Sequence, residues 1–316
     1  MASTDVKFAL IFLFQMVVGI LGNFWLFYHF TSHYLRGYGA KSTGLILRHL
    51  TLINSLVILS RGIPETMAAF EPKSFLSDFG CKVVFFVHRV ARGMSMDTTC
   101  LLSVFQAITI SPWGSRWAML KGKASQYVGP SNILCWTLNI ILHIMVPVYV
   151  TDKWNSRNTS RTMDLGYCTS KLHDKHTDLL YMLLLSVHDV LSLGLITWAS
   201  VFMVSILHKH RHQVQHIHRT KVPPTSSPEI RATQSILVLV STFVSFYTFS
   251  SIIYIYFSVF YETCWWLMTI SALINSGFPT ACPFILLSHN HSSYWKCLWV
   301  YNFLKCLFIY FERDRA

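Results

Sequence analysis

The chain has 316 residues, of which 53% are hydrophobic, 15% aromatic and only 13% charged, and its formal net charge is +12. Length alone would suggest about two soluble domains, but this composition is typical of a membrane protein instead. A nucleic-acid-binding protein clusters its Lys and Arg on a folded soluble face, whereas here they are scattered between long apolar runs. We therefore expect no nucleic-acid partner.

Seven apolar runs are each long enough to cross a hydrocarbon core of about 30 Å at about 1.5 Å per residue. They predict helices at about residues 8–30, 45–70, 81–111, 128–150, 178–207, 232–260 and 264–287. We expect an all-α membrane protein, with a seven-transmembrane helix bundle in residues 1–287 and a cytoplasmic tail in residues 288–316. The odd number of crossings places the two termini on opposite sides.

Lys and Arg indicate the orientation, because cytoplasmic loops carry an excess of both. One side of the predicted topology, with the tail and the helix boundaries, holds fifteen of them, and the other side holds eight. The N-terminus is therefore expected outside and the C-terminus in the cytoplasm, with the first run as an uncleaved anchor. Three acids accompany the fifteen bases, so the cytoplasmic side accounts for the whole charge of +12.

Charged residues interrupt three of the predicted helices: the second, the third and the fifth. In the second helix, Arg61 and Glu65 are four positions apart and share a face, which favours a local ion pair near the outer surface. The third helix carries a larger set: His88, Arg89, Arg92 and Asp97. Charges inside a hydrocarbon layer are costly unless they face a partner or a water-filled cavity, so we expect this helix at the centre of the bundle.

The arginines of the third helix leave two interpretations open. Arg89 and Arg92 share a face with His88 and must meet acids or a polar ligand. In the first interpretation they form a structural network with Glu65, Asp97 or Asp189; in the second they contact a ligand, and both can hold in one pocket. Asp189 is the one acid deep within the fifth helix, which makes it a functional-site candidate, and these arginines are its expected partners.

Cysteines are expected in two roles. Cys81, at the start of the third helix, has a plausible disulfide partner in Cys168 of the second outer loop, because the outside is oxidising. Three others are expected to be buried small hydrophobic residues: Cys100, Cys135 and Cys282.

Loops and the tail carry weaker signals. Pro147 is expected to kink or end the fourth helix, and Asn158-Thr159-Ser160 is a glycosylation sequon on the outer side. The basic third inner loop predicts a cytoplasmic partner or anionic lipid, and its histidines lack the Cys or carboxylate support of a metal site. The aromatic tail at residues 294–311 is expected as an interfacial helix.

Enzyme and cofactor motifs are missing from the sequence. It contains no phosphate-binding P-loop, no dinucleotide-binding glycine pattern, no zinc-protease helix motif and no nucleophile elbow. The acids within the helices are not arranged as a pair for acid and base catalysis. We therefore expect neither an enzyme nor a cofactor.

Several stretches resemble the vomeronasal type-1 receptors, a family of G-protein-coupled receptors. They include Asp164-Leu165-Gly166-Tyr167-Cys168 and Phe278-Pro279-Thr280. The full set covers residues 62–70, 88–90, 100–112, 129–136, 164–168, 213–216, 231–248 and 278–280. The resemblance implies a multi-pass plasma-membrane chemosensory receptor for small airborne or urinary molecules, a pheromone receptor that couples to an inhibitory-class G protein.

Two motifs of rhodopsin-like receptors are missing, as in the resembled family. The inner end of the third helix reads Phe105-Gln106-Ala107 in place of Asp-Arg-Tyr, and the seventh helix lacks Asn-Pro-x-x-Tyr. An ionic lock of the rhodopsin kind is therefore not expected. The chain departs from the family at His188, where a proline commonly precedes the acid of the fifth helix.

The predicted ligand pocket lies among helices two, three, five, six and seven. Its candidate residues, chosen by depth and polarity, are Arg61, Glu65, His88, Arg89, Arg92, Asp189 and Tyr254. Residues expected to face the G protein are Gln106, Arg116, Lys209, Arg211 and Arg231. The alternatives are a bitter-taste-type chemoreceptor and a transporter or channel; the latter is disfavoured because the sequence shows no internal repeat.

Overall fold

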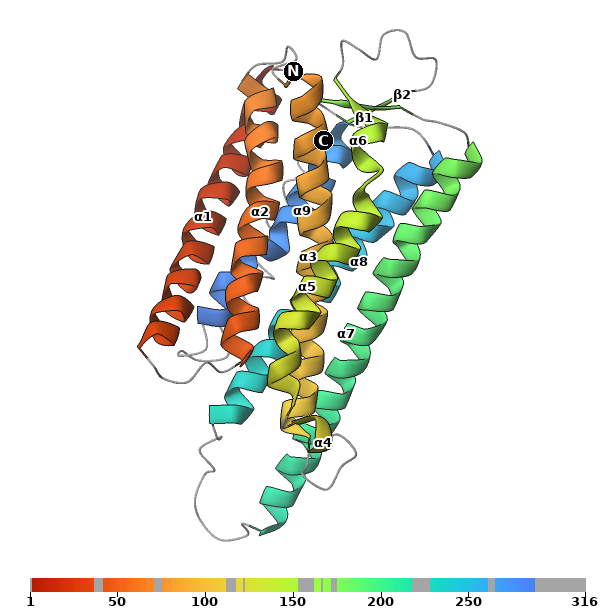
Figure 1. Ribbon diagram of the computed structural model, residues 1–316. Helices are drawn as coiled ribbons and strands as arrows, with labels where there is room; N and C mark the ends of the chain where they lie inside the picture. Colours follow the sequence, from red (N-terminus) through yellow and green to blue (C-terminus); the bar gives the residue numbers. More distant parts are fainter. Residues whose placement is uncertain are drawn as a thin grey trace.

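The chain folds as a bundle of long helices (Figure 1). In this computed structural model the described residues are 2–36, 42–70, 76–111, 118–121, 123–152, 162–165, 167–171, 175–217, 228–260 and 265–287. Within them, seven helices have 20 residues or more: α1 (Ala2–Leu35), α2 (Ser42–Phe70), α3 (Asp78–Ile110), α5 (Ala124–His143), α7 (Lys175–Ile217), α8 (Pro228–Phe260) and α9 (Trp265–Leu287). This is the all-α bundle that the sequence predicts.

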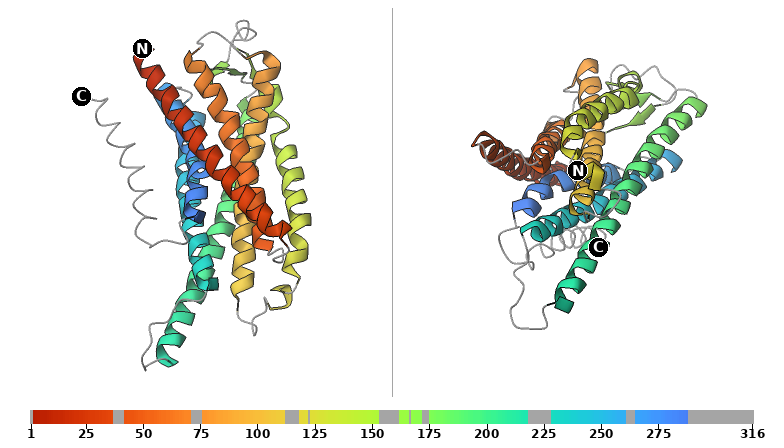
Figure 2. Two further views of the ribbon diagram at one scale, coloured as in Figure 1. Left: turned by 90° about the vertical axis from the view of Figure 1, so that its left-hand side faces the viewer. Right: turned by 60° about the horizontal axis from the view of Figure 1, so that its bottom comes forward.

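Several of these helices differ in length from the prediction; α1 is longer at both ends, α5 ends early and α7 extends further. The fourth ends at His143, and after a turn the short helix α6 (Val146–Tyr149) begins, with Pro147 in its first turn. Proline lacks an N–H group and its ring clashes with the carbonyl four residues earlier, here that of His143, so α5 cannot continue through it. α7 instead runs to Ile217, past the predicted apolar run, and projects beyond the other helices (Figure 2).

A small antiparallel sheet lies at one end of the bundle, and the sequence did not predict it. Its strands are β1 (Val150–Thr151), β2 (Thr162–Asp164) and β3 (Thr169–Lys171), in the order β1-β3-β2. Ser170 in the central strand pairs with Val150 on one side and with Met163 on the other. Strands of two or three residues are too short to show the apolar alternation that identifies a strand.

The predicted disulfide joins Cys81 and Cys168, which links this sheet to the first turn of α3. Both cysteines are fully buried and pack with Phe85, Val146 and Tyr167. We call this the disulfide end of the bundle, where α1 also begins. The short helix α4 (Ala118–Lys121) marks the opposite end, the α4 end.

Helix α3 lies at the centre of the bundle, where it contacts α2, α5, α7 and α8 (Figure 1). Among the described residues, six helical segments are long and apolar enough to cross a membrane. The long helix outside that set is α3. Arg89, Arg92 and Asp97 interrupt its apolar sequence, and its interior position places Arg92 and His88 among buried residues. Central placement therefore lets the bundle hold a helix that lipid would not accept alone.

Helix α9 contains two prolines, and a side chain of α1 compensates for one of them. Pro283 has no N–H group to offer the carbonyl of Pro279, four residues earlier. The buried Asn23 amide of α1 donates to that carbonyl at 2.9 Å instead. In a bilayer a carbonyl freed by a proline needs a substitute partner, and here a neighbouring helix supplies it.

Candidate functional site

A buried polar cluster connects α3 with α5 and α7 about halfway along α3. Its centre is Asp97, whose side chain is 11% exposed. One carboxylate oxygen accepts a hydrogen bond from the Asn139 amide of α5 at 2.6 Å, and the other accepts from the Ser192 hydroxyl of α7 at 3.4 Å. His188 Nε2 lies 3.3 Å from the latter oxygen. We call these four residues the Asp97 cluster.

Close approach of α3 and α5 makes this cluster possible. Gly93 faces Asn139, and a Cβ atom at Gly93 would lie 1.9 Å from the Asn139 side-chain oxygen. The Asn139 amide nitrogen is also 2.9 Å from the carbonyl of Cys135, so its position is fixed from two sides. Glycine is thus required here by space, since any side chain would push the two helices apart.

Arg92 forms a second link, from α3 to both α7 and α8. Its guanidinium lies 3.5 Å from the Asp189 carboxylate and 5.2 Å from the ring centroid of Tyr247. The Tyr247 hydroxyl in turn donates to the backbone carbonyl of Arg92 at 3.2 Å. Arg92 is 7% exposed, so the salt bridge and the cation–π contact act in a poorly solvated interior. The structure thus contains the predicted pairing of Asp189 with a third-helix arginine.

His188 joins the two links. Its Nε2 lies 3.3 Å from Asp97, and its Nδ1 lies 3.6 Å from the neighbouring carboxylate of Asp189. One ring therefore bridges the acid of α3 and the acid of α7.

Two further predicted residues form an ion pair nearer the disulfide end. Arg61 and Glu65 lie 2.8 Å apart on α2, with side chains 14% and 18% exposed. This is the local ion pair that the sequence predicts, between residues one helical turn apart. The pair lies at the same end of the bundle as the sheet, since α2 runs from the α4 end toward the disulfide end.

His88 is 4% exposed and bonds to α2 through one nitrogen only. The Ser60 hydroxyl donates to the carbonyl of Val57 at 3.2 Å and therefore accepts from His88 Nδ1 at 3.3 Å. The other ring nitrogen, Nε2, is then an acceptor, and it has no hydrogen-bond partner among the described residues. A buried polar atom of this kind costs about 1–3 kcal/mol, which a hydrogen-bond donor would recover.

Sequence reasoning missed a polar link among α2, α3 and α5. Trp136 donates its indole N–H to His49 Nε2 at 3.0 Å, so His49 Nδ1 carries the proton toward the Thr98 hydroxyl at 3.2 Å. It also missed Asn139, Ser192 and Tyr247. A polar residue in an apolar run signals an inward direction, but it does not identify the helix that it meets.

The remaining candidate residues are distributed as follows. Arg89 is half-buried on α3, Gln106 is buried and donates to the Thr43 hydroxyl at 3.0 Å, and Lys209 is exposed near the end of α7. The side chains of Tyr254, Arg211 and Arg231 lie outside the part of the chain that the structure describes, as do the whole residues Arg116 and Asn158 and the tail. Within the described residues, no group of His, Cys, Asp and Glu is arranged to hold a metal ion.

Asp78 anchors the sheet to α3 at the disulfide end. Its carboxylate pairs with Lys82 and accepts hydrogen bonds from the Thr151 hydroxyl at 2.7 Å and from the Asp152 backbone N–H at 3.4 Å. The hydrogen bond from Lys82, above all, lowers the pKa of this carboxyl below its usual value. The Asp78 carboxylate is therefore charged in the folded protein at neutral pH.

Residues 6–298 match the vomeronasal organ pheromone receptor family. The chain is 53% identical over 280 residues to vomeronasal type-1 receptor 2 of Homo sapiens, covering 89% of this chain and 71% of that one. It is 31% identical over 280 residues to olfactory receptor class A-like protein 1 of Danio rerio, covering 88% of each. The fold is similar to squid rhodopsin, with a TM-score of 0.70 over 90% of this chain and 77% of that one, at 14% identity.

Proposed function

Because this chain belongs to the vomeronasal organ pheromone receptor family, and is therefore a multi-pass G-protein-coupled receptor of the plasma membrane, we propose that it binds a small pheromone-like molecule among its helices and activates an inhibitory-class G protein. The observation that carries the proposal is the Arg92 link, which ties α3 to α7 and α8 at one buried residue. The family match favours this function over a bitter-taste-type receptor or a transporter.

The ligand would enter from the disulfide end, which we place outside the cell. This orientation follows from the excess of Lys and Arg in the loops of the other side. It also puts the disulfide and the sequon at Asn158 in the oxidising compartment where glycosylation takes place. The tail and the α4 end would then face the cytoplasm and the G protein.

Ligand binding would act on the contacts of Arg92 and His88. A ligand group that accepts from Arg92 competes with Asp189, and a ligand donor bonds to the acceptor nitrogen of His88. The contact with Arg92 changes the balance between two positions of α7 and α8 relative to α3, because Arg92 joins these three helices. The ligand shifts that balance only by the difference between its affinities for the two states.

The test compares arginines of α3 with one at the other end of the bundle. Arg89→Ala and Arg92→Ala should abolish the agonist response while surface labelling stays at the level of the unmodified chain. Arg48→Ala is the matched control, because Arg48 stacks on Tyr34 at 5.3 Å, at the α4 end and away from the proposed pocket. Loss of surface expression in Arg89→Ala and Arg92→Ala alone would favour a purely structural network and contradict a ligand role.

A further inference from the structure

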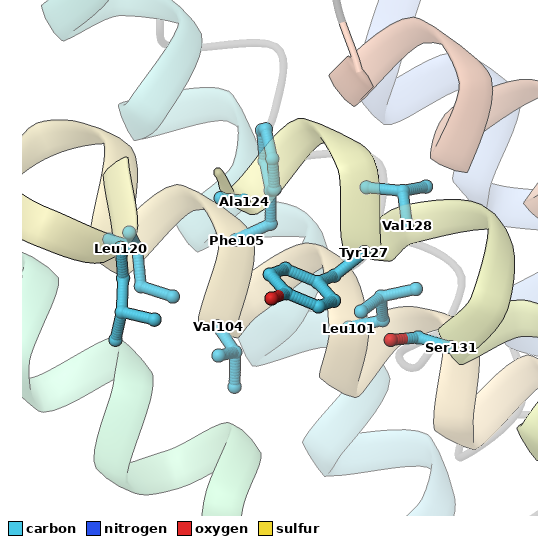
Figure 3. A pocket seen from close by; sticks show the side chains of 9 residues that line it. Leu101, Val104, Phe105, Leu120, Ala124, Tyr127, Val128 and Ser131 are labelled. Atoms are coloured by element: carbon cyan, nitrogen blue, oxygen red, sulfur yellow. The ribbon is translucent and has the colours of Figure 1, made fainter. Parts of the chain in front are cut away.

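An apolar groove opens between α3 and α5 at the α4 end, far from the Arg92 link (Figure 3). Its cavity volume is about 170 Å³. α3 contributes residues 101, 104, 105 and 108, and α5 contributes residues 124, 127, 128 and 131. Both sets follow the spacing of one helix face, so two parallel apolar stripes form the walls. Leu120 of α4 closes one end.

The groove is open toward the surroundings of the bundle. Val128 at its floor is 3% exposed, whereas Tyr127 and Leu120 at its edges are 57% and 42% exposed. Figure 3 shows the Tyr127 ring extending from α5 over the groove. A cavity of about 150 Å³ holds one benzene molecule, so this volume accepts a segment of one hydrocarbon chain. Because the walls belong to membrane helices, the molecules next to the opening are lipids.

The rim of the groove is basic. Lys121 and Lys123 lie in the short segment between Leu120 and Ala124, which both line the groove. Lys121 donates to the carbonyl of Ser111 at 3.4 Å, which places its charge at the last turn of α3, and Lys123 is exposed. The sequence has no acidic residue between positions 97 and 152. The charge at this rim therefore complements an anionic head group.

We propose that the groove binds one anionic phospholipid of the membrane leaflet at the α4 end. An acyl chain lies along the stripes of α3 and α5, and the phosphate lies beside Lys123 and Lys121. The Tyr127 hydroxyl is at the boundary between them, as is usual for tyrosine at a membrane interface. Basic pockets between membrane helices bind anionic head groups by this combination of apolar wall and cationic rim.

The site is tested by lipid retention on the purified full chain in mixed nanodiscs of phosphatidylcholine and phosphatidylserine, followed by native mass spectrometry. The unmodified chain should retain one phosphatidylserine in preference to phosphatidylcholine. Lys123→Gln should reduce that preference about fivefold, because one Lys near an anionic surface contributes about 1 kcal/mol. The matched control Arg36→Gln removes an exposed charge from the end of α1, at the same end of the bundle, and should leave the preference unchanged.

A second variant tests the apolar walls. Ala124→Trp fills the groove with an indole and should lower retention of both lipids, whatever their head group. Equal retention of the two lipids by the unmodified chain would overturn the proposal. So would an equal effect of Lys123→Gln and Arg36→Gln, which would indicate general surface attraction. Displacement of the retained signal by inorganic phosphate would show a phosphate site in place of a lipid site.

Discussion

Gly93→Ala tests whether the Asp97 cluster holds α3 and α5 together. The new Cβ atom would lie 1.9 Å from the side-chain oxygen of Asn139 and 3.0 Å from its Cγ. Asn139 is fully buried, and its amide nitrogen is held by Asp97 at 2.6 Å and by the Cys135 carbonyl at 2.9 Å. The amide therefore moves away only by breaking the bond to the carboxylate, or else the two helices separate.

The expected loss of stability has two parts. Overpacking of a close-packed interior costs about 1–3 kcal/mol, and loss of a hydrogen bond to a charged group costs about 1.5–3 kcal/mol. Alanine recovers about 1 kcal/mol through its higher helix propensity. Gly93→Ala should therefore lower the free energy of unfolding by about 1.5–5 kcal/mol in total.

Thermal unfolding of the purified chain in detergent, followed by circular dichroism, measures this loss. Gly194→Ala on α7 is the matched control, since a Cβ atom there meets nothing within 4 Å, and this variant should be as stable as the unmodified chain or more so. Asn139→Ala should make Gly93→Ala less harmful when the two are combined, because the clash then disappears. If Gly93→Ala unfolds at the same temperature as Gly194→Ala, Gly93 and Asn139 are not in close contact and the reasoning is refuted.

Three further variants test other parts of the bundle. Cys81→Ser opens the disulfide that spans 87 residues and should cost about 2–4 kcal/mol, seen as a lower unfolding temperature without reductant and no further loss with it. Tyr247→Phe keeps the ring beside Arg92 but removes the hydrogen bond to its carbonyl, so thermal unfolding should show a loss of about 0.5–1.5 kcal/mol. The lowered pKa of Asp78 means that its charge stabilises the fold fully above the ordinary value of 3.8, and this contribution is lost as the pH falls through the lower pKa of the folded state. Asp78→Asn, which cannot pair with Lys82, should therefore remove that part of the pH dependence of the unfolding temperature.

The overall bundle and its central helix could be predicted because membrane burial restricts the sequence strongly. Apolar runs identify helices by length, and the charges of α3 exclude it from the lipid surface. The pairing of Asp189 with an arginine of α3 could be predicted because an unpaired charge inside the membrane is costly, and the bundle offers few basic partners for a buried acid. The Cys81–Cys168 disulfide could be predicted because both cysteines are expected on the outer side, which is oxidising.

Contacts that depend on helix rotation could not be predicted. The partners of Asn139 and Trp136 are set by which helix the inward face of α5 meets. A polar residue such as Asn139 indicates that inward face, but it does not identify the helix on the other side. Gly93 is one of several helical glycines, and nothing in the sequence separates it from Gly194, which faces open space. The strands at the disulfide end have only two or three residues each, too few to show the alternation that identifies a strand.

The most direct test of receptor function is the response of cells that express the tagged chain with an inhibitory-class G protein. Cyclic AMP is measured against a panel of sulfated steroids and small volatiles, with surface labelling of the same cells. We predict a ligand-dependent fall in cyclic AMP that disappears when the G protein is inactivated and in Arg92→Ala. A ligand-evoked current that persists without any G protein would contradict a G-protein-coupled function and favour a channel.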